Sequence, residues 1–269
     1  MEGIARTILH ALDTKSQIDP ISAADPTFDL DAAYGVSGMV MAARIARGER
    51  PAGWKIGFTN RTIWDEYGVH APIWGPMYAG TIHASDGGDA VAELPADGFV
   101  EPRIEPEIVF RIARTPLPEM DERALLSCID AVAHSFEVVQ SVYPDWKFAA
   151  ADTVAAFGLH GALVHGPLVP VEPDRADEWL EKLSNFTITL FRDGEEIDSG
   201  HARNVLDGPL SALRHFVAGF DAQHTARGIE AGDLVTTGTV TRAFPVAGGQ
   251  TWSTRIDGLP LPGMKLAFR

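Results

Sequence analysis

Two glutamates separated by a single residue, Glu105 and Glu107, are the most chemically informative feature of the sequence. Alternate side chains of a strand point to one face, so these residues would stand about 6.5–7 Å apart at their Cα atoms. Neighbouring carboxylates repel each other unless a positive charge lies between them, and hard divalent cations such as Mg²⁺ or Mn²⁺ prefer oxygen ligands. The spacing therefore suits a metal site. On spacing alone, a solvated strand face with Arg103 and Arg111 as ion-pair partners is the more frequent explanation.

Glu137 is a third acid, in the strand-like segment from His134 to Ser141. It shares a strand face with Ser135, Val139 and Ser141. An acid in such a segment is costly to bury without a partner. Glu137 could complete a three-carboxylate site, and an exposed glutamate is the alternative.

A lysine lies among apolar and small residues in Gly53-Trp-Lys-Ile-Gly-Phe-Thr59. Partial burial can lower a lysine pKa toward neutrality, so that the group serves as an acid or base, or it can hold an anionic substrate. The simpler alternative for Lys55 is a surface lysine whose stem lies on apolar neighbours.

Composition limits the function classes. The 269 residues are 45% hydrophobic and 22% charged, as in a globular protein, and the net charge of −15 disfavours nucleic-acid binding. The single cysteine, Cys128, excludes an internal disulfide. The longest segments without a formal charge, 67–85 and 153–171, contain glycine, proline and histidine and do not predict membrane spans. The first residues lack a signal-peptide pattern, so we expect a cytoplasmic protein.

The elements that would position these residues indicate an α+β protein. We expect an N-terminal helical arm and lysine loop over residues 1–79 and a β-rich catalytic core over 80–269. The arm would contain helices over 2–13 and 30–46, joined by a loop. In the core we expect strands, a hairpin and helices. The strands cover 103–112, 134–141, 234–240 and parts of 251–269, the hairpin covers 186–198, and the helices cover 121–132 and 208–220.

The order of these motifs resembles a known family. Gly-x-Lys-Ile-Gly-x-Thr at 53–59 is followed by Trp74-Gly75, Glu-x-Glu at 105–107, Glu137, Asp152-Thr-Val-Ala155 and the segment 231–246. From about Ala33 onward, the chain is similar to the 2-keto-4-pentenoate hydratase and 4-oxalocrotonate decarboxylase type of the fumarylacetoacetate hydrolase superfamily.

The resemblance implies a mixed β-roll core behind an N-terminal helical arm, and usually an oligomer. It also implies Mg²⁺ or Mn²⁺ held by three carboxylates, which match Glu105, Glu107 and Glu137, and a lysine that matches Lys55. The metal would chelate the keto and carboxylate oxygens of a small 2-oxo acid. In the hydratases a 2-hydroxydienoate tautomerises and gains water to give a 4-hydroxy-2-oxo acid, as in late steps of aromatic meta-cleavage pathways.

The sequence departs from the hydratase pattern at the residues that would transfer protons. Gly80 stands where an aspartate pairs with the lysine, Ala156 and Phe157 replace Asp-Asn, and a serine is missing at Leu159 or His160. Other groups could substitute, with His160, His134 and His83 as candidates. The reaction could also differ: decarboxylation of a 4-oxalocrotonate-like substrate, C–C hydrolysis of an acylpyruvate, or metal-dependent ligand binding without turnover.

We therefore expect a metal-dependent hydratase with a small-molecule 2-oxo acid substrate and no nucleic-acid or membrane partner. Lys55, His160 and Asp152 are the expected catalytic residues, although Asp152 could instead support a neighbour or begin a turn. The expected substrate-binding residues are Trp54, Phe58, Trp74 and Thr241. Aromatic residues near glycine loops are as often packing residues.

Overall fold

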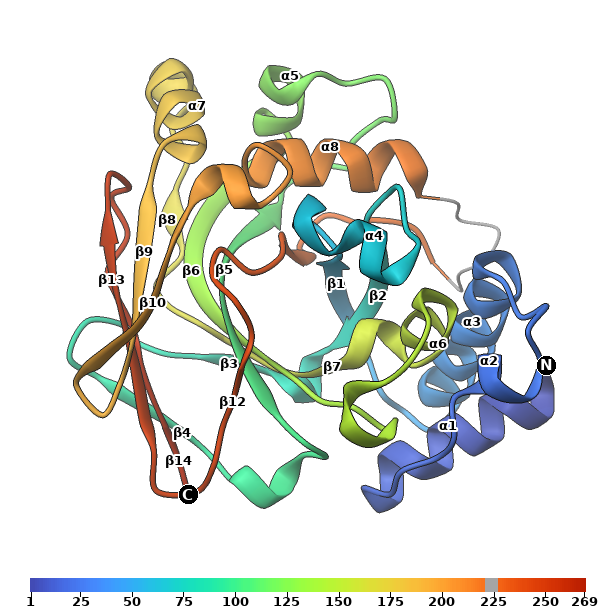
Figure 1. Cartoon of the computed structure of the whole chain (residues 1–269). Helices are drawn as coiled ribbons and strands as arrows, with labels where there is room; N and C mark the ends of the chain where they lie inside the picture. The colour runs from blue at the N-terminus through green and yellow to red at the C-terminus, as the bar shows by residue number, and fades with distance from the viewer. Residues whose placement is uncertain (221–226) are drawn as a thin grey trace.

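The computed structural model describes residues 1–220 and 227–269. These residues form two β-sheets flanked by helices (Figure 1). The helices are α1 (Glu2–Thr14), α2 (Ile21–Ala24), α3 (Leu30–Ala46), α4 (Trp64–Tyr67), α5 (Glu122–Leu126), α6 (Ala150–Ala155), α7 (Ala176–Ser184) and α8 (Pro209–Gly219). The strands are β1 (Pro51–Gly57), β2 (Ile73–Tyr78), β3 (Ile82–Ala84), β4 (Val91–Leu94), β5 (Arg103–Ile112), β6 (Ile129–Val139), β7 (His160–His165), β8 (Val169–Pro170), β9 (Thr187–Arg192), β10 (Glu195–His201), β11 (Leu234–Thr236), β12 (Phe244–Pro245), β13 (Thr251–Asp257) and β14 (Lys265–Phe268).

The larger sheet carries both the acidic residues and the lysine. Its strands run in the order β2-β1-β11-β5-β6-β7-β3, with β12 beside β5 and β8 beside β6. In the antiparallel β5–β6 pair, Glu105 lies directly opposite Glu137. Strand β1, which contains Lys55, reaches this pair through β11. The expected division at residues 79 and 80 does not coincide with this sheet, because β1 and β2 belong to it and only α1–α3 form the arm.

The smaller sheet has the order β10-β9-β13-β14-β4 and packs against the larger one (Figure 1). Trp252 and Phe268 from this sheet share a buried cluster with Phe136 of β6. The predicted hairpin is present as β9 and β10, joined at Asp193-Gly194. These sheets confirm the predicted α+β fold of the β-roll type.

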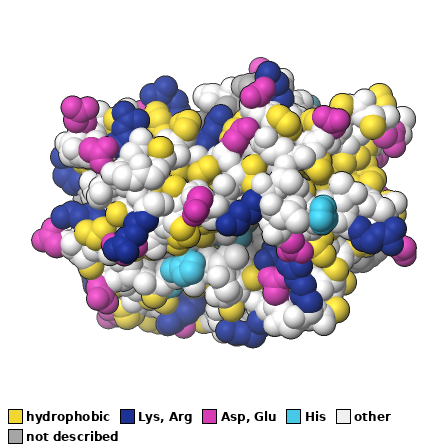
Figure 2. Space-filling view, turned by 90° about the horizontal axis from the view of Figure 1, so that it is seen from below, with side chains coloured by type: hydrophobic (Ala, Val, Ile, Leu, Met, Phe, Trp, Pro, Cys, Tyr) yellow, Lys and Arg dark blue, Asp and Glu magenta, His cyan; other side chains and the backbone are white. Residues whose placement is uncertain are grey.

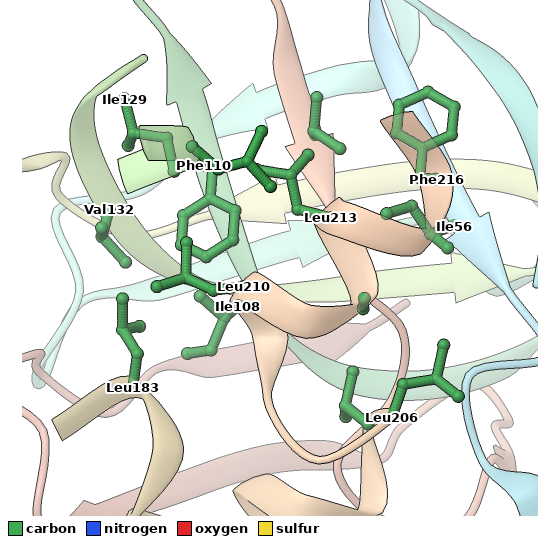
Figure 3. Packing of buried hydrophobic residues seen from close by; sticks show 14 of the residues in the cluster. Ile56, Ile108, Phe110, Ile129, Val132, Leu183, Leu206, Leu210, Leu213 and Phe216 are labelled. Carbon is green, nitrogen blue, oxygen red and sulfur yellow. The ribbon is translucent and has the colours of Figure 1, made fainter. Parts of the chain in front are cut away.

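Helix α8 packs against the larger sheet through a shared apolar core. Figure 3 shows Leu213 and Phe216 of this helix facing the apolar side chains of Ile56, Ile108 and Phe110. Burial of each such side chain contributes about 1.5–3 kcal/mol relative to exposure. The strands that hold the acids and the lysine are thus anchored by a common core.

The helical arm packs against α6 at the side of the molecule away from the smaller sheet (Figure 1). Asp29 caps α3 by accepting a hydrogen bond from the Ala32 amide at 2.9 Å. Ile8, Val36 and Val154 belong to the cluster that joins α1, α3 and α6. The helices predicted at 2–13 and 30–46 are confirmed, whereas the expected loop between them contains α2.

Two predicted elements are shorter than expected. The helix predicted over 121–132 begins at its Asp121 cap but ends at Leu126, because Ile129 onward pairs with β5 as strand β6. Strand β6 is buried on both faces, so it lacks the alternating pattern of a half-exposed strand. The strand predicted over 234–240 ends at Thr236, and the chain then turns at Gly238, whose φ of +95° favours glycine.

Acidic and basic side chains are interspersed on the face shown in Figure 2. Among the described residues, no helix combines the length and apolar character needed to cross a membrane.

Candidate active site

Three carboxylates meet where β5 and β6 pair. Glu107 and Glu137 are fully buried and Glu105 is partly buried. One oxygen from each of the three lies within 4.8 Å of the others. The strand register causes this arrangement, since Glu105 faces Glu137 across the ladder and Glu107 follows on the same face.

The buried oxygens are only partly satisfied by the protein. Glu107 Oε2 accepts a hydrogen bond from the Gly238 amide at 2.8 Å, and Glu137 Oε1 lies 2.9 Å from His160 Nδ1. Glu107 Oε1 has no hydrogen-bond partner within the described parts of the chain, and Glu137 Oε2 has the Lys55 ammonium at 3.4 Å as its ion-pair partner. An unsatisfied buried carboxylate oxygen is costly, and a hard cation would satisfy it. The donor set therefore suits a divalent metal held by Glu105, Glu107 and Glu137.

Electrostatics in the cluster support the same conclusion. Burial and the neighbouring carboxylates raise the pKa of Glu105 to about 7 and that of Glu107 well above its ordinary value. Burial also acts to raise the pKa of Glu137, but the Lys55 charge and the His160 hydrogen bond outweigh it and lower that pKa. Three carboxylates beside one ammonium leave two excess negative charges when all are ionised, which a divalent cation balances.

Lys55 is buried at the edge of the cluster. Its Nζ lies 3.4 Å from Glu137 Oε2 and donates a hydrogen bond to the Gly158 carbonyl oxygen at 2.9 Å. Burial acts to lower its pKa, but the three carboxylates outweigh this effect and raise it, so the side chain stays an ammonium. The alternative of a surface lysine is therefore wrong.

A turn with left-handed backbone conformation, residues 157–159, lies against the Lys55 side chain. Phe157, Gly158 and Leu159 all have positive φ angles between 48° and 64°. A Cβ atom on Gly158 would lie 2.6 Å from Lys55 Cδ, too close for the present position of the side chain. Gly158 is thus a site residue that the sequence analysis did not single out. The available signal was a glycine placed directly after Ala156-Phe157, where the sequence departs from the family pattern.

His160 contacts the carboxylate cluster through Glu137. Its Nδ1 contacts Glu137 Oε1, and its Nε2 lies 2.9 Å from Thr81 Oγ1. Burial lowers its pKa, and the Glu137 contact offsets this effect only in part. This geometry fits a residue that positions Glu137. Of the other candidate histidines, His134 contacts the Glu107 carbonyl oxygen and Thr254, and His83 is exposed.

A cavity of about 500 Å³ opens beside the cluster. Lys55, Glu105, Gly158, Phe58 and Thr241 line it, so Phe58 and Thr241 lie where substrate-binding residues were expected. The sequence analysis missed the other aromatic residues of this wall, because they come from segments far apart in the chain. They are Tyr67, Trp146 and Phe148.

Trp54 and Trp74 do not line this cavity. Both are buried in the core, where their rings pack against Phe216 and Phe220 at centroid distances of 4.9–6.2 Å. Trp54 directly precedes Lys55 on β1, and successive residues of a strand point to opposite faces. The structure therefore assigns the two tryptophans a packing role in place of the expected substrate contact.

Asp152 lies apart from the cavity wall and is fully buried. Its carboxylate accepts hydrogen bonds from the Ser22 amide and hydroxyl at 3.0 and 2.5 Å and from the Ala149 amide at 2.8 Å. These contacts fasten α2 and the start of α6 together. The alternative of a supporting residue describes Asp152 better than the expected catalytic role.

Comparison with known proteins identifies the class. The model of the fumarylacetoacetate (FAA) hydrolase C-terminal domain matches residues 66–261, and the chain belongs to this family. Among curated proteins, the chain is 29% identical to a 2-hydroxyhexa-2,4-dienoate hydratase of Comamonas testosteroni and 30% identical to a 2-keto-4-pentenoate hydratase of Paraburkholderia phymatum; each match covers 96% of this chain and 94% of the relative. It is 28% identical to a Pseudomonas 4-oxalocrotonate decarboxylase over 82% of this chain and 80% of that protein.

A solved structure is also similar over nearly the whole chain. The 4-oxalocrotonate decarboxylase from Pseudomonas putida G7, complexed with magnesium and adipate, superposes with a TM-score of 0.87 and 25% sequence identity. The match covers 99% of this chain and 96% of that one. The family named from sequence motifs is thereby confirmed.

Proposed function

We propose that the protein is a metal-dependent lyase that adds water to a short 2-hydroxydienoate or 2-oxo-enoate and yields a 4-hydroxy-2-oxo acid. The observation that carries this proposal is the buried cluster of Glu105, Glu107 and Glu137 beside Lys55, at the wall of a 500 Å³ cavity. The hydratase relatives support the reaction type.

Glu105, Glu107 and Glu137 would hold Mg²⁺ or Mn²⁺ as oxygen ligands. When bound, the cation would polarise a keto oxygen and offset the charge of a substrate carboxylate. Gly238 and His160 hold two of the three acids in place through their hydrogen bonds. Ligands fixed in this way need little rearrangement when the ion binds.

Lys55 would orient the substrate and take part in proton transfer. The Gly158 carbonyl oxygen and Glu137 fix its ammonium at the cavity wall. From there the ammonium can donate a hydrogen bond to a substrate oxygen and stabilise negative charge that develops on it. The apolar and aromatic side chains around it limit the access of bulk water.

Decarboxylation of a 4-oxalocrotonate-like substrate is the second candidate. Hydration needs a group that activates water, and the aspartate expected beside the lysine is replaced by Gly80. Loss of CO₂ needs no water activation: the C–C bond breaks, its electron pair enters the conjugated keto system, and a proton later reaches carbon. The similar decarboxylase structure supports keeping this alternative.

The test begins with protein freed of metal by a chelator. We expect calorimetry to show binding of Mg²⁺ or Mn²⁺, and binding of oxalate, a mimic of a chelating 2-oxo acid, only when the metal is present. Glu137→Gln should abolish both signals, whereas Glu119→Gln, at an exposed site, should leave them unchanged. Absence of metal binding by the wild-type protein would reject the proposal.

Product analysis then separates the reactions. The protein with Mg²⁺ or Mn²⁺ is incubated with a 2-hydroxydienoate and, separately, with an unsaturated 2-oxo dicarboxylic acid. A 4-hydroxy-2-oxo acid as product supports the hydratase, and CO₂ supports the decarboxylase. Metal and oxalate binding without turnover on either substrate would indicate an inactive homologue.

A homo-oligomeric state and a cytoplasmic location stay predictions.

A further inference from the structure

Arg44, in the last turn of α3, is a largely buried cation of the helical arm. Its side chain is 13% exposed, and its guanidinium donates two hydrogen bonds to Glu49 Oε2, at 2.9 and 2.5 Å. Its Cζ atom lies 3.7 Å from the centroid of the Tyr78 ring and 5.4 Å from that of the Phe157 ring. Both distances are within the range of a cation–π contact. The guanidinium is therefore held by one carboxylate and two aromatic rings.

These three partners belong to segments that surround Lys55. Glu49 lies two residues before β1, the strand that contains the lysine, and Tyr78 ends β2, which pairs with β1. Phe157 begins the turn that lies against the lysine side chain. Arg44 thus connects the beginning of the lysine strand with the turn that contacts the lysine.

The turn needs support from outside, because two of its residues carry a side chain in an unfavourable backbone conformation. The φ angles of Phe157 and Leu159 are 48° and 63°, and a left-handed residue other than glycine costs about 1–2 kcal/mol. Such a backbone persists only where surrounding contacts fix it. Strand β2 supplies one contact, since a Cβ atom on Gly75 would lie 2.3 Å from the Phe157 carbonyl oxygen. The buried Phe157 ring supplies another, because it packs in the cluster of the arm beside Arg44.

Gly158, at the centre of the turn, contacts the lysine in two ways. Its carbonyl oxygen accepts the hydrogen bond from Lys55 Nζ at 2.9 Å, and a Cβ atom on its Cα would lie 2.6 Å from Lys55 Cδ. A shift of the turn would move this acceptor, and the ammonium would follow it or turn toward Glu137, whose Oε2 lies 3.4 Å away. Misplacement of a reacting group by about 1 Å can lower a rate about 100-fold.

We propose that Arg44 is a positioning residue for Lys55. Its guanidinium holds the Phe157 ring and thereby the turn. In this conformation the turn presents the Gly158 carbonyl oxygen to the ammonium, so the helical arm takes part in forming the active site. The inference rests on the proposed function for what Lys55 does in the reaction, but the position of the ammonium can be measured without turnover.

The position of Lys55 can be followed by NMR of protein that contains isotope-labelled lysine. Of the five lysines in the chain, Lys55 is buried and the other four are half-buried or exposed. A buried, hydrogen-bonded ammonium exchanges its protons with water slowly, so its signal should persist where those of exposed lysines vanish. Loss of this signal in Lys55→Met assigns it. In Arg44→Met we expect the signal to move, and its protons to exchange with water about tenfold faster or more.

Turnover gives a second measurement. Arg44→Met should lower kcat about 10- to 100-fold with little change in KM, because the carboxylates and the cavity are intact while the ammonium is displaced. Arg44→Lys should recover part of the loss, since its ammonium can keep the pair with Glu49 but cannot stack flat on the two rings. In a Phe157→Leu background, Arg44→Met should have a smaller effect than in the wild type, because the ring through which the arginine acts is already gone.

Arg47→Met is the matched control, because Arg47 pairs with Glu49 and Asp13 on the exposed side of the arm. It should keep the wild-type lysine signal and kcat. Oxalate binding with Mg²⁺ should be equal in the wild type, in both Arg44 variants and in Arg47→Met, which shows that they remain folded and can load metal.

An unchanged lysine signal in Arg44→Met would overturn the inference, whatever the change in kcat, while oxalate binding upholds the metal site. Loss of oxalate binding in both Arg44 variants would also overturn it, because the arginine would then support the fold as a whole. Failure of the wild type to bind oxalate would overturn the proposed function, and the lysine signal would still decide whether Arg44 positions Lys55.

Discussion

Glu105 should make a contribution to the stability of the metal-free protein that is lost as the pH rises through neutrality. Burial raises the pKa of Glu105 from an ordinary value of 4.5 to about 7, and it raises the pKa of Glu107 in the same direction. Between these two values Glu105 keeps its proton in the folded protein and loses it in the unfolded chain. The folded state then binds more protons than the unfolded state, so the free energy of unfolding falls as the pH rises.

The size of the effect follows from the Glu105 shift. Each pH unit between the folded and unfolded pKa is worth about 1.4 kcal/mol, so the full shift corresponds to about 3 kcal/mol. Glu105 is only partly buried, and solvent in the cavity will screen some of the interaction. We therefore expect about 2 kcal/mol from this residue, present at pH 5 and lost by pH 8. Glu107 adds to the loss, whereas the lowered pKa of Glu137 contributes stability that is lost only toward acid pH. The lowered pKa values of the buried His134 and His160 act against the loss, because their contribution to stability grows as the pH rises toward 6.5. The Glu105 contribution is therefore read from the difference between the wild type and a variant without this carboxyl.

The assay is urea unfolding of chelator-treated protein at intervals from pH 5 to pH 8. Glu105→Gln removes the titrating group and should show a pH-dependent loss smaller by about 2 kcal/mol, while Glu119→Gln at an exposed site should follow the wild type. Saturating Mg²⁺ should suppress most of the wild-type loss, because the cation favours the ionised carboxylates. Identical pH profiles for the wild type and Glu105→Gln would refute the electrostatic account of the cluster.

Three further predictions separate the roles of individual residues. Glu107→Gln should weaken Mg²⁺ binding at least tenfold in calorimetry, about 1.4 kcal/mol or more, while the protein remains folded by circular dichroism. Gly158→Ala should displace the Lys55 side chain and lower kcat about 10- to 100-fold with metal affinity unchanged, so a loss of metal affinity would contradict the steric argument. Asp152→Ala should cost about 2–3 kcal/mol in urea unfolding through its lost contacts to Ser22, yet retain metal affinity, and an intact stability would contradict the structural role.

The sequence alone predicted the elements whose patterns are local. Helix α3 has the expected bounds because Asp29 caps it and a run without proline sustains it. Strand β5 also has the expected bounds, and its period of two places Glu105 and Glu107 on one face. The carboxylate cluster was therefore accessible from spacing, and the family resemblance linked Glu137 to it.

The remaining features depend on tertiary contacts that no local pattern encodes. Periodicity could not separate Trp54 from Lys55, since a strand buried on both faces has apolar residues in either direction. Asp152 stood in a family motif, but its partner Ser22 lies 130 residues away in the arm. The aromatic cavity wall joins Tyr67 to Phe148, with ring centroids 5.7 Å apart, through the folding of two distant segments.

The missing aspartate has a consequence for the charge of the whole site. Three ionised carboxylates, one ammonium and a divalent cation sum to zero, whereas an added acid beside Lys55 would make the loaded site negative. Here Lys55 donates to the neutral Gly158 carbonyl oxygen, and the residue at the family position of the acid is Gly80. A neutral loaded site repels an anionic substrate less than a negative site would. The absence of an acid beside Lys55 therefore favours binding of the anionic 2-oxo acid that the proposed function requires.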